Sequence, residues 1–447
     1  MILNRVPQSL VKLPPKISIK WSESLRDWFQ TILSERFEPV FRLQHEMLDS
    51  IIGIEYEIRE TELLRKELKA GIAAIKTAGD VAGVREQQAR ITGMEERVSG
   101  LRYLRECILF IGDTIATRLL HVDAIKHMAG FQSPGFISGK EGLEAERGAA
   151  AKFYSEGWIV LFNDLTHSLR IGDLTLRKGE KVRTFEVKTS AEAYATEEAF
   201  RQIATPILIH DYIENDRTRL PLIVKESTDI SRPDALVAGA ARVNSGIDEE
   251  WHFEVPGELY RALRKNRVVS LVKGAKHYLA ARSEDKSLLL DSLNELTTED
   301  NWIAGNLQHR VVEYGDIPPF SRWFKPESTV EVMTGGLLVI SAVNLNKLAN
   351  LFAAKQVEIT WERRLDDLLP IRFTPKFEAD AQYDVQRVNI CDWHRLRMLY
   401  AFLAAETFVA ICVFMLSPAG LKAFTDVLER SKSSPSASSE DSKTAPG

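Results

Sequence analysis

A β-hairpin with one apolar and one charged face is predicted by the stretch IGDLTLRKGEKVRTFEVKTS, residues 171–190. Gly179-Glu180 is a Gly-X pair of the kind that closes a two-residue turn, so Lys178 is expected to pair with Lys181. Because successive residues of a strand point to opposite faces, one face of the hairpin is apolar. It carries Leu174, Leu176, Phe185 and Val187, whereas the other face carries Asp173, Thr175, Thr184, Glu186 and Lys188.

The same register places the Asp173 carboxylate directly opposite that of Glu186. Opposed side chains on a ladder have Cβ atoms about 4.5–5.5 Å apart, so two like charges there repel. A divalent cation removes this repulsion and takes oxygen ligands. Magnesium keeps several waters, and one of them can act as the nucleophile in phosphodiester hydrolysis, with Lys188 orienting it or stabilising the developing charge. The alternative is a surface hairpin whose acids pair with neighbouring arginines and lysines.

The segments around the hairpin predict one compact α/β unit, residues 139–226. A helix at 141–156 comes first, followed by strands at 158–163, 171–177 and 182–188, a helix at 191–213 and a strand at 220–224. The first helix adds two more acids, Glu144 and Glu146. The order is therefore αβββαβ.

This order and these acids resemble the PD-(D/E)XK nuclease superfamily, nearest to its Holliday-junction resolvase and Mrr-like restriction branches. Glu146 lies in the helix, Gly157 ends that helix, Asp173 starts the second strand, and Glu186-Val187-Lys188 ends the third. One residue departs from the pattern, since Gly172 and not proline precedes Asp173. Glu144 is the alternative helix acid if the register differs by two residues.

The resemblance implies a restriction-endonuclease-like fold and a metal-dependent nuclease. Glu146, Asp173, Glu186 and the Val187 carbonyl would bind Mg²⁺ or Mn²⁺, and Lys188 would be catalytic. The expected substrate is nucleic acid, DNA in the first place, cut in repair or in restriction of foreign DNA. The alternative from another class is a non-catalytic scaffold that keeps the nuclease fold.

The segment GFISGK at 135–140 is similar to a phosphate-binding loop but is one residue too short. Glu141 also stands where that motif has the Ser or Thr that holds magnesium. We therefore interpret the segment as a linker between the regions that flank it.

Two long helices are predicted before the linker, in residues 33–130, after an N-terminal segment of residues 1–32. Apolar side chains recur at alternating spacings of four and three residues, as in Met47, Ile51, Ile54 and Ile58 and again in Ile91, Met94, Val98 and Leu101. Thr77-Ala78-Gly79-Asp80 between them reads as a helix stop followed by a new cap. We expect an antiparallel, coiled-coil-like hairpin with a solvated outer face. The alternative is an arm for homodimerisation or for a protein partner.

A mixed α+β region of unknown role is predicted at 233–430. Alternating apolar residues occur at 251–255 and 337–343, a helix at 346–355, a strand at 357–360 and a late helix from Trp393. The serine-rich segment 431–447 is expected to be disordered. The fold class is thus α+β and multidomain.

Composition limits the partners. The chain has 447 residues with 58 Lys and Arg against 63 Asp and Glu, a net charge of −5, so nucleic acid would be bound by a local patch. Residues 168–190 supply such a patch, with six basic residues against three acids.

Three dispersed cysteines argue against a disulfide framework or zinc site and favour a cytoplasmic location, and no secretory-signal pattern is seen at the start. The apolar stretch 398–421, interrupted by Glu406, is expected to be a buried helix. The alternative is a membrane-associated protein anchored by this stretch.

Overall fold

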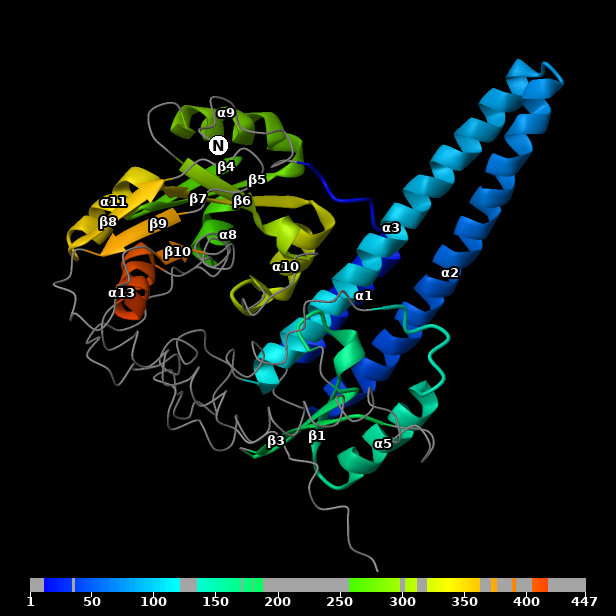
Figure 1. Ribbon diagram of the computed structural model, residues 1–447, viewed down its shortest axis with the longest axis horizontal. Helices are drawn as coiled ribbons and strands as arrows, with labels where there is room; N and C mark the ends of the chain where they lie inside the picture. The colour runs from blue at the N-terminus through cyan, green and yellow to red at the C-terminus, as the bar shows by residue number, and fades with distance from the viewer. Residues whose placement is uncertain are drawn as a thin grey trace, which may run out of the picture.

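The computed structural model describes residues 12–33, 37–120, 135–169, 172–179, 181–187, 257–297, 302–311, 320–361, 371–375, 388–390 and 404–416. These residues form an α+β structure in which two β-containing units contact the base of a helical hairpin (Figure 1). The predicted helix at 191–213, the strands at 220–224 and 251–255, Lys188 and the segment 431–447 lie outside the described residues.

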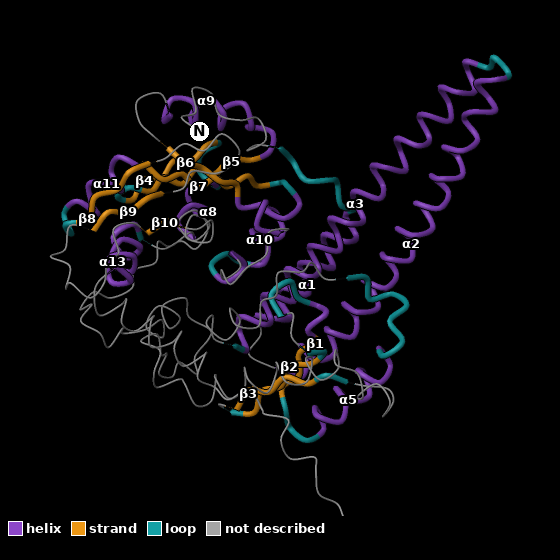
Figure 2. Tube along the Cα trace, in the orientation of Figure 1, coloured by secondary structure: helices purple, strands orange, loops and turns teal. Residues whose placement is uncertain are grey.

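The hairpin is formed by α2 (Phe37–Thr77) and α3 (Val81–Leu119), which confirms the two predicted helices and the turn between them. Asp80 caps α3 by accepting a hydrogen bond from the Gly83 amide at 2.8 Å, and Gly79 has a φ of +74°. The far part of the hairpin extends away from both β units (Figure 2).

A shorter helix, α1 (Ile19–Leu33), crosses the base of the hairpin and was not predicted from the sequence. Its buried side chains follow helical spacing, at Leu25, Trp28, Phe29 and Ile32. The helix contacts both α2 and α3 and also α10 (Pro326–Thr334) of the second β unit. It therefore joins the hairpin to the C-terminal half of the chain.

The first β unit consists of α5 (Leu143–Ser155), β1 (Ile159–Phe162), the 3-10 helix η2 (Asn163–Leu165), β2 (Leu174–Lys178) and β3 (Lys181–Phe185). The strands form an antiparallel sheet in the order β1-β2-β3. The predicted register of β2 and β3 is confirmed, since Thr175 pairs with Thr184 and Lys178 with Lys181. Gly157, with a φ of +82°, ends α5 as expected. The described part of this unit has the order αβββ.

The second β unit contains a four-stranded antiparallel sheet in the order β4-β5-β7-β6. Its elements are α8 (Gly257–Leu263), β4 (Val268–Lys273), β5 (Lys276–Arg282), η4 (Ser283–Asp285), α9 (Lys286–Thr297), β6 (Trp302–Asn306), η5 (Leu307–Val311), η6 (Phe320–Arg322), α10 and β7 (Leu337–Asn344). A second, three-stranded sheet follows, in the order β10-β9-β8. It is formed by β8 (Val357–Trp361), β9 (Ile371–Pro375) and β10 (Val388–Ile390), with α11 (Leu345–Ala353) and α13 (Ala405–Leu416) beside it.

The strand β7 lies where the sequence showed alternating apolar residues, at 337–343. All eight of its residues are buried. Leu338 and Ile340 pack with Leu289 and Leu293 of α9, whereas the side chains between them join the main core. Because β5 and β6 flank β7 and both faces are covered, every side chain of this central strand is enclosed.

The helix α13 confirms a buried helix within the apolar stretch 398–421. Ala405, Phe408, Val409 and Cys412 are buried along one stripe, and the Phe408 ring lies 6.4 Å from the ring of Phe352 in α11. In the part of the chain that is described, no helix has both the length and the apolar character to cross a bilayer. The neighbouring strand and helix, β8 and α11, also match their predicted positions.

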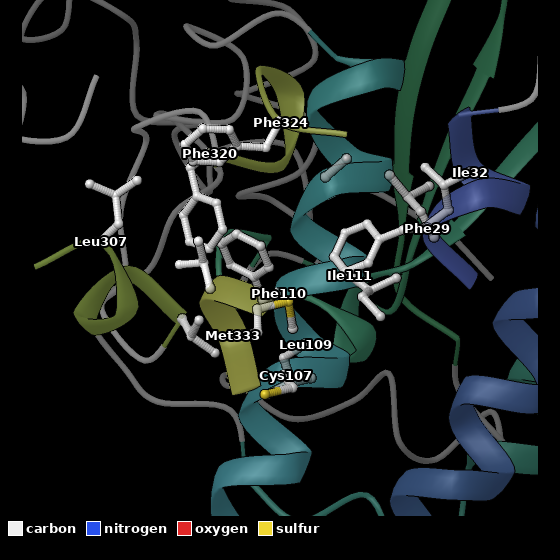
Figure 3. Packing of buried hydrophobic residues seen from close by; sticks show 14 of the residues in the cluster. Phe29, Ile32, Cys107, Leu109, Phe110, Ile111, Leu307, Phe320, Phe324 and Met333 are labelled. Atoms are coloured by element: carbon white, nitrogen blue, oxygen red, sulfur yellow. The ribbon is translucent and has the colours of Figure 1, made fainter. Parts of the chain in front are cut away.

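The core between the hairpin and the second β unit is apolar and aromatic (Figure 3). Phe110 of α3 lies 4.8 Å from Phe320, measured between ring centroids, and 6.4 Å from Phe29 of α1. Two neutral hydrogen bonds accompany this packing. The Tyr103 hydroxyl donates to the Met333 carbonyl at 2.6 Å, and the hydroxyls of Thr114 and Ser321 are 2.6 Å apart.

Candidate functional site

Asp173 lies just before β2 and is held by backbone groups at the end of β3. Its amide donates to the Phe185 carbonyl at 2.7 Å, and its Oδ2 accepts a hydrogen bond from the Val187 amide at 2.7 Å. Gly172 has a φ of +71°, and a Cβ at this position would lie 2.8 Å from the Phe185 oxygen. Proline cannot adopt this φ, which gives a local reason for the glycine before Asp173.

The regular ladder of β2 and β3 stops one residue short of the predicted Asp173–Glu186 pair. The ladder keeps the predicted register and ends at the pair Leu174–Phe185, so Glu186 follows the last residue of β3. The left-handed residue before Asp173 bends the chain and directs its carboxylate to the Val187 amide. Glu186 and Val187, which follow β3 directly, are half-buried.

Glu146 is the acid of α5 that faces the site. Its side chain is only 2% exposed, because its helix packs on β1 and on α2, where Tyr154 stacks on Phe41 with ring centroids 4.2 Å apart. Glu144 was the alternative, but its side chain is 87% exposed and lies near Arg147. The structure therefore supports the register in which Glu146 is the inner residue.

A lysine that the sequence analysis assigned to a linker connects the acids. The Nζ atom of Lys140 lies 2.6 Å from Oε1 of Glu146, 2.8 Å from Oδ2 of Asp164 and 2.8 Å from Oδ1 of Asp173. Lys140 follows Gly139, whose φ is +86°, in the short turn before α5. Asp164 comes from η2, and its role was also missed. Neither residue belongs to a periodic pattern, so only the fold brings them to the acids.

The electrostatics of this cluster follow from burial and from the excess of negative charge. Burial raises the pKa of Glu146 to about 7, with a further contribution from the Asp173 charge, while the hydrogen bond from Lys140 opposes the increase. For Lys140, burial disfavours the ammonium form, but Asp164 and Asp173 outweigh it and raise its pKa above the ordinary value. Three carboxylates share one lysine, so the cluster has room for more positive charge.

The donor set fits a divalent cation chemically, since Mg²⁺ and Mn²⁺ bind carboxylate and carbonyl oxygens. Glu146 and Asp173 direct one oxygen each to the same point, and that point holds the Lys140 ammonium. Among the described residues, no group of three or more His, Cys, Asp or Glu side chains is arranged to hold a metal ion. A cation bound by Glu146 and Asp173 would therefore require Lys140 to move.

The helical hairpin holds the loop that carries Asp164. His167 lies between Asp113 and Glu106 of α3, with ring nitrogens 2.6 Å and 2.7 Å from their carboxylate oxygens. The Ser168 amide and hydroxyl also donate to Asp113, at 2.9 Å and 2.7 Å. The close approach depends on Gly112, because a Cβ at that position would lie 1.7 Å from the Leu165 carbonyl oxygen.

The hairpin holds the loop that carries Lys140 in a similar way. Arg105 of α3 and Glu55 of α2 form a buried ion pair at 2.8 Å, and the other Glu55 oxygen accepts a hydrogen bond from the Ser138 amide at 2.6 Å. Arg59 donates to the Ser138 carbonyl at 2.8 Å. Both loops that contribute polar side chains to the site are therefore positioned by charged groups of the two long helices.

Comparison with known proteins produced no match to a protein family, to a curated protein or to a solved structure.

Proposed function

We propose that this protein is a metal-dependent nuclease that hydrolyses phosphodiester bonds, with DNA as the expected substrate. The observation that carries the proposal is that the Glu146 and Asp173 carboxylates converge on one cation, the Lys140 ammonium. These acids come from a helix and from the start of a strand, and both contact the Lys140 ammonium. Their convergence beside a hairpin of the predicted register matches the arrangement that the sequence resemblance implies.

In this proposal, Glu146, Asp173, Glu186 and the Val187 carbonyl hold Mg²⁺ or Mn²⁺. The bound ion would supply an activated water and would polarise the phosphate. The Val187 amide keeps the Asp173 carboxylate in one orientation, which a ligand needs. Lys188, beside Val187 in the chain, is the proposed group that orients the water or stabilises the developing negative charge.

Exposed basic side chains on the same hairpin would contact the phosphate backbone. Lys178, Lys181 and Arg183 are exposed near the turn, and the Lys178 and Arg183 cations lie 5.9 Å and 5.6 Å from the centroid of the Trp158 ring. Lys178 also donates to the Glu156 carbonyl at 2.8 Å. Contacts of this kind bind nucleic acid without reading its sequence.

The second candidate is a non-catalytic scaffold, and one observation favours it. Lys140 pairs with three carboxylates at once, so these acids already serve a structural purpose without a metal. A scaffold would keep this cluster for stability and would gain nothing from binding Mg²⁺.

The test is a cleavage assay with the full chain on linear, circular and single-stranded DNA and on RNA, with Mg²⁺, Mn²⁺ or EDTA. We expect cutting that requires metal and falls about 10²-fold or more in Asp173→Ala and Lys188→Ala. Glu144→Gln is the matched control, because it removes an exposed acid from the same helix as Glu146, and it should keep full activity. Absence of cutting by the wild type, together with no Mn²⁺ binding by calorimetry, would favour the scaffold.

A further inference from the structure

The position of Lys140 bears on how the proposed site takes up a metal. Its Nζ atom lies within 2.8 Å of oxygens from Glu146, Asp164 and Asp173. Two of these carboxylates are proposed metal ligands. An ammonium group and a divalent cation cannot both occupy the point where the oxygens converge, because the two positive charges would repel strongly at such a distance.

Lys140 is also the member of the cluster best able to move. Glu146 is buried on a helix, and Asp173 is held by the Val187 amide. Lys140 instead extends from a turn, on a flexible four-carbon stem, and its side chain is 30% exposed. When the Lys140 side chain withdraws toward solvent, it loses three ion pairs. The carboxylates stay in position for a cation of higher charge.

We propose that Lys140 is an internal counter-cation that occupies the carboxylate cluster until a divalent metal ion displaces it. This inference rests on the proposed metal site and adds its regulation. Without metal, the Lys140 ammonium offsets the negative charge of the acids, so the site stays folded. The metal binds only when the concentration of the free ion is high enough to displace this tethered ammonium. Lys140 is thus a positioning residue, because it acts on the carboxylates and not on the substrate.

The first experiment measures Mn²⁺ binding by calorimetry, without nucleic acid, for the wild type and for Lys140→Met. Methionine keeps an unbranched stem but has no charge, so the competitor is removed. We expect Lys140→Met to bind Mn²⁺ at least about tenfold more tightly, since the wild type binds only in the fraction of molecules whose site is open. Lys152→Met is the matched control, because Lys152 is an exposed lysine of α5 outside the cluster, and its affinity should equal that of the wild type.

A second measurement uses the wild type alone and so does not depend on how the variant folds. Acetylation of lysines, followed by mass spectrometry, reports the exposure of each amine. Lys140 should react several-fold faster in Mn²⁺ than in EDTA, whereas the rate at Lys152 should not change. Thermal unfolding adds a third readout. In EDTA, Lys140→Met should melt below the wild type, and Mn²⁺ should recover this loss.

The outcomes separate this inference from the proposed function. If the wild type cuts nucleic acid with Mn²⁺ but Lys140→Met binds Mn²⁺ no more tightly and Lys140 stays unreactive, the displacement is wrong and the nuclease stands. If neither protein binds Mn²⁺ and the wild type does not cut, both proposals fail. Tighter binding by Lys140→Met supports the displacement whichever substrate is cut.

Discussion

The base of the helical hairpin is contacted by two β units, and the two contacts differ in chemistry (Figures 1 and 3). The contact with the second β unit is made by aromatic and aliphatic side chains around Phe110 and Phe320, with a few neutral hydrogen bonds. The contact with the first β unit adds buried charges to its apolar packing. Arg105 pairs with Glu55, and His167 lies between Asp113 and Glu106.

The difference shows what each contact contributes. Apolar packing stabilises in proportion to the area removed from water and tolerates small changes of position. A buried ion pair adds little net stability compared with an apolar pair of the same shape, but an arrangement that leaves one charge unpaired is costly. We infer that the apolar contact holds the two halves of the chain together, whereas the charged contact selects one position for the loops that carry Lys140 and Asp164.

The largest effect is expected at the apolar contact. Phe110→Ala should lower the free energy of unfolding by about 3–5 kcal/mol, because removal of a buried ring that packs between Phe29 and Phe320 creates a cavity. Urea unfolding of the full chain checks this, and the loss should be the same at low and high salt. Leu63→Ala, at an exposed position of α2, is the control and should change little. A loss at Phe110 below about 1 kcal/mol would contradict this description of the core.

A somewhat smaller change in the free energy of unfolding is expected at the charged contact, where a double variant tests whether the charges position the loop. Arg105→Met leaves Glu55 buried without its partner and should cost about 3 kcal/mol. The double variant Glu55→Met/Arg105→Met removes both charges and should recover most of that loss. In the cleavage assay, however, the double variant should stay impaired, because the Ser138 amide loses its acceptor beside Lys140. Recovery of full activity would show that the charges do not position the loop.

The pH dependence should separate the two contacts further. Burial opposes the charged form of His167, but Asp113 and Glu106 outweigh it and raise its pKa above the usual value. The stabilisation is therefore fully present below about pH 6.5 and is lost as the pH rises through the folded-state pKa. Thermal unfolding between pH 6 and 9 should show this loss in the wild type and a flatter profile in His167→Gln. Identical profiles would mean that His167 is not charged in the folded protein.

The smallest effect is expected on the far part of the hairpin, where ion pairs are exposed. Arg97 and Glu57 are 2.7 Å apart across α2 and α3, with side chains 64% and 40% exposed. Arg97→Ala should change the free energy of unfolding by less than about 0.5 kcal/mol, and 1 M salt should abolish the difference. A loss comparable with that of Arg105→Met would show that the arm is more enclosed than its exposure indicates.

The elements that local patterns specify were predicted well. The Gly179 turn determines the pairing of Thr175 with Thr184, and Asp80 after Gly79 marks the start of α3. The helices predicted at 141–156 and 346–355 correspond to α5 and α11, whose ends differ from those ranges by one or two residues. The predicted Asp173–Glu186 pair lies one residue beyond the regular ladder, beside the left-handed Gly172, and strand alternation does not specify this conformation.

The hairpin register, the two long helices and the choice of Glu146 and Asp173 as candidate acids could be predicted from sequence, because turns and periodic side chains act over a few residues. The burial of β7 on both faces and the contacts of Lys140 and Asp164 with the acids became visible only in the folded chain. These contacts link residues far apart in the chain, through a turn, a 3-10 helix and loops held on α2 and α3. No local pattern encodes them, since the same residues would be ordinary surface charges on any other fold.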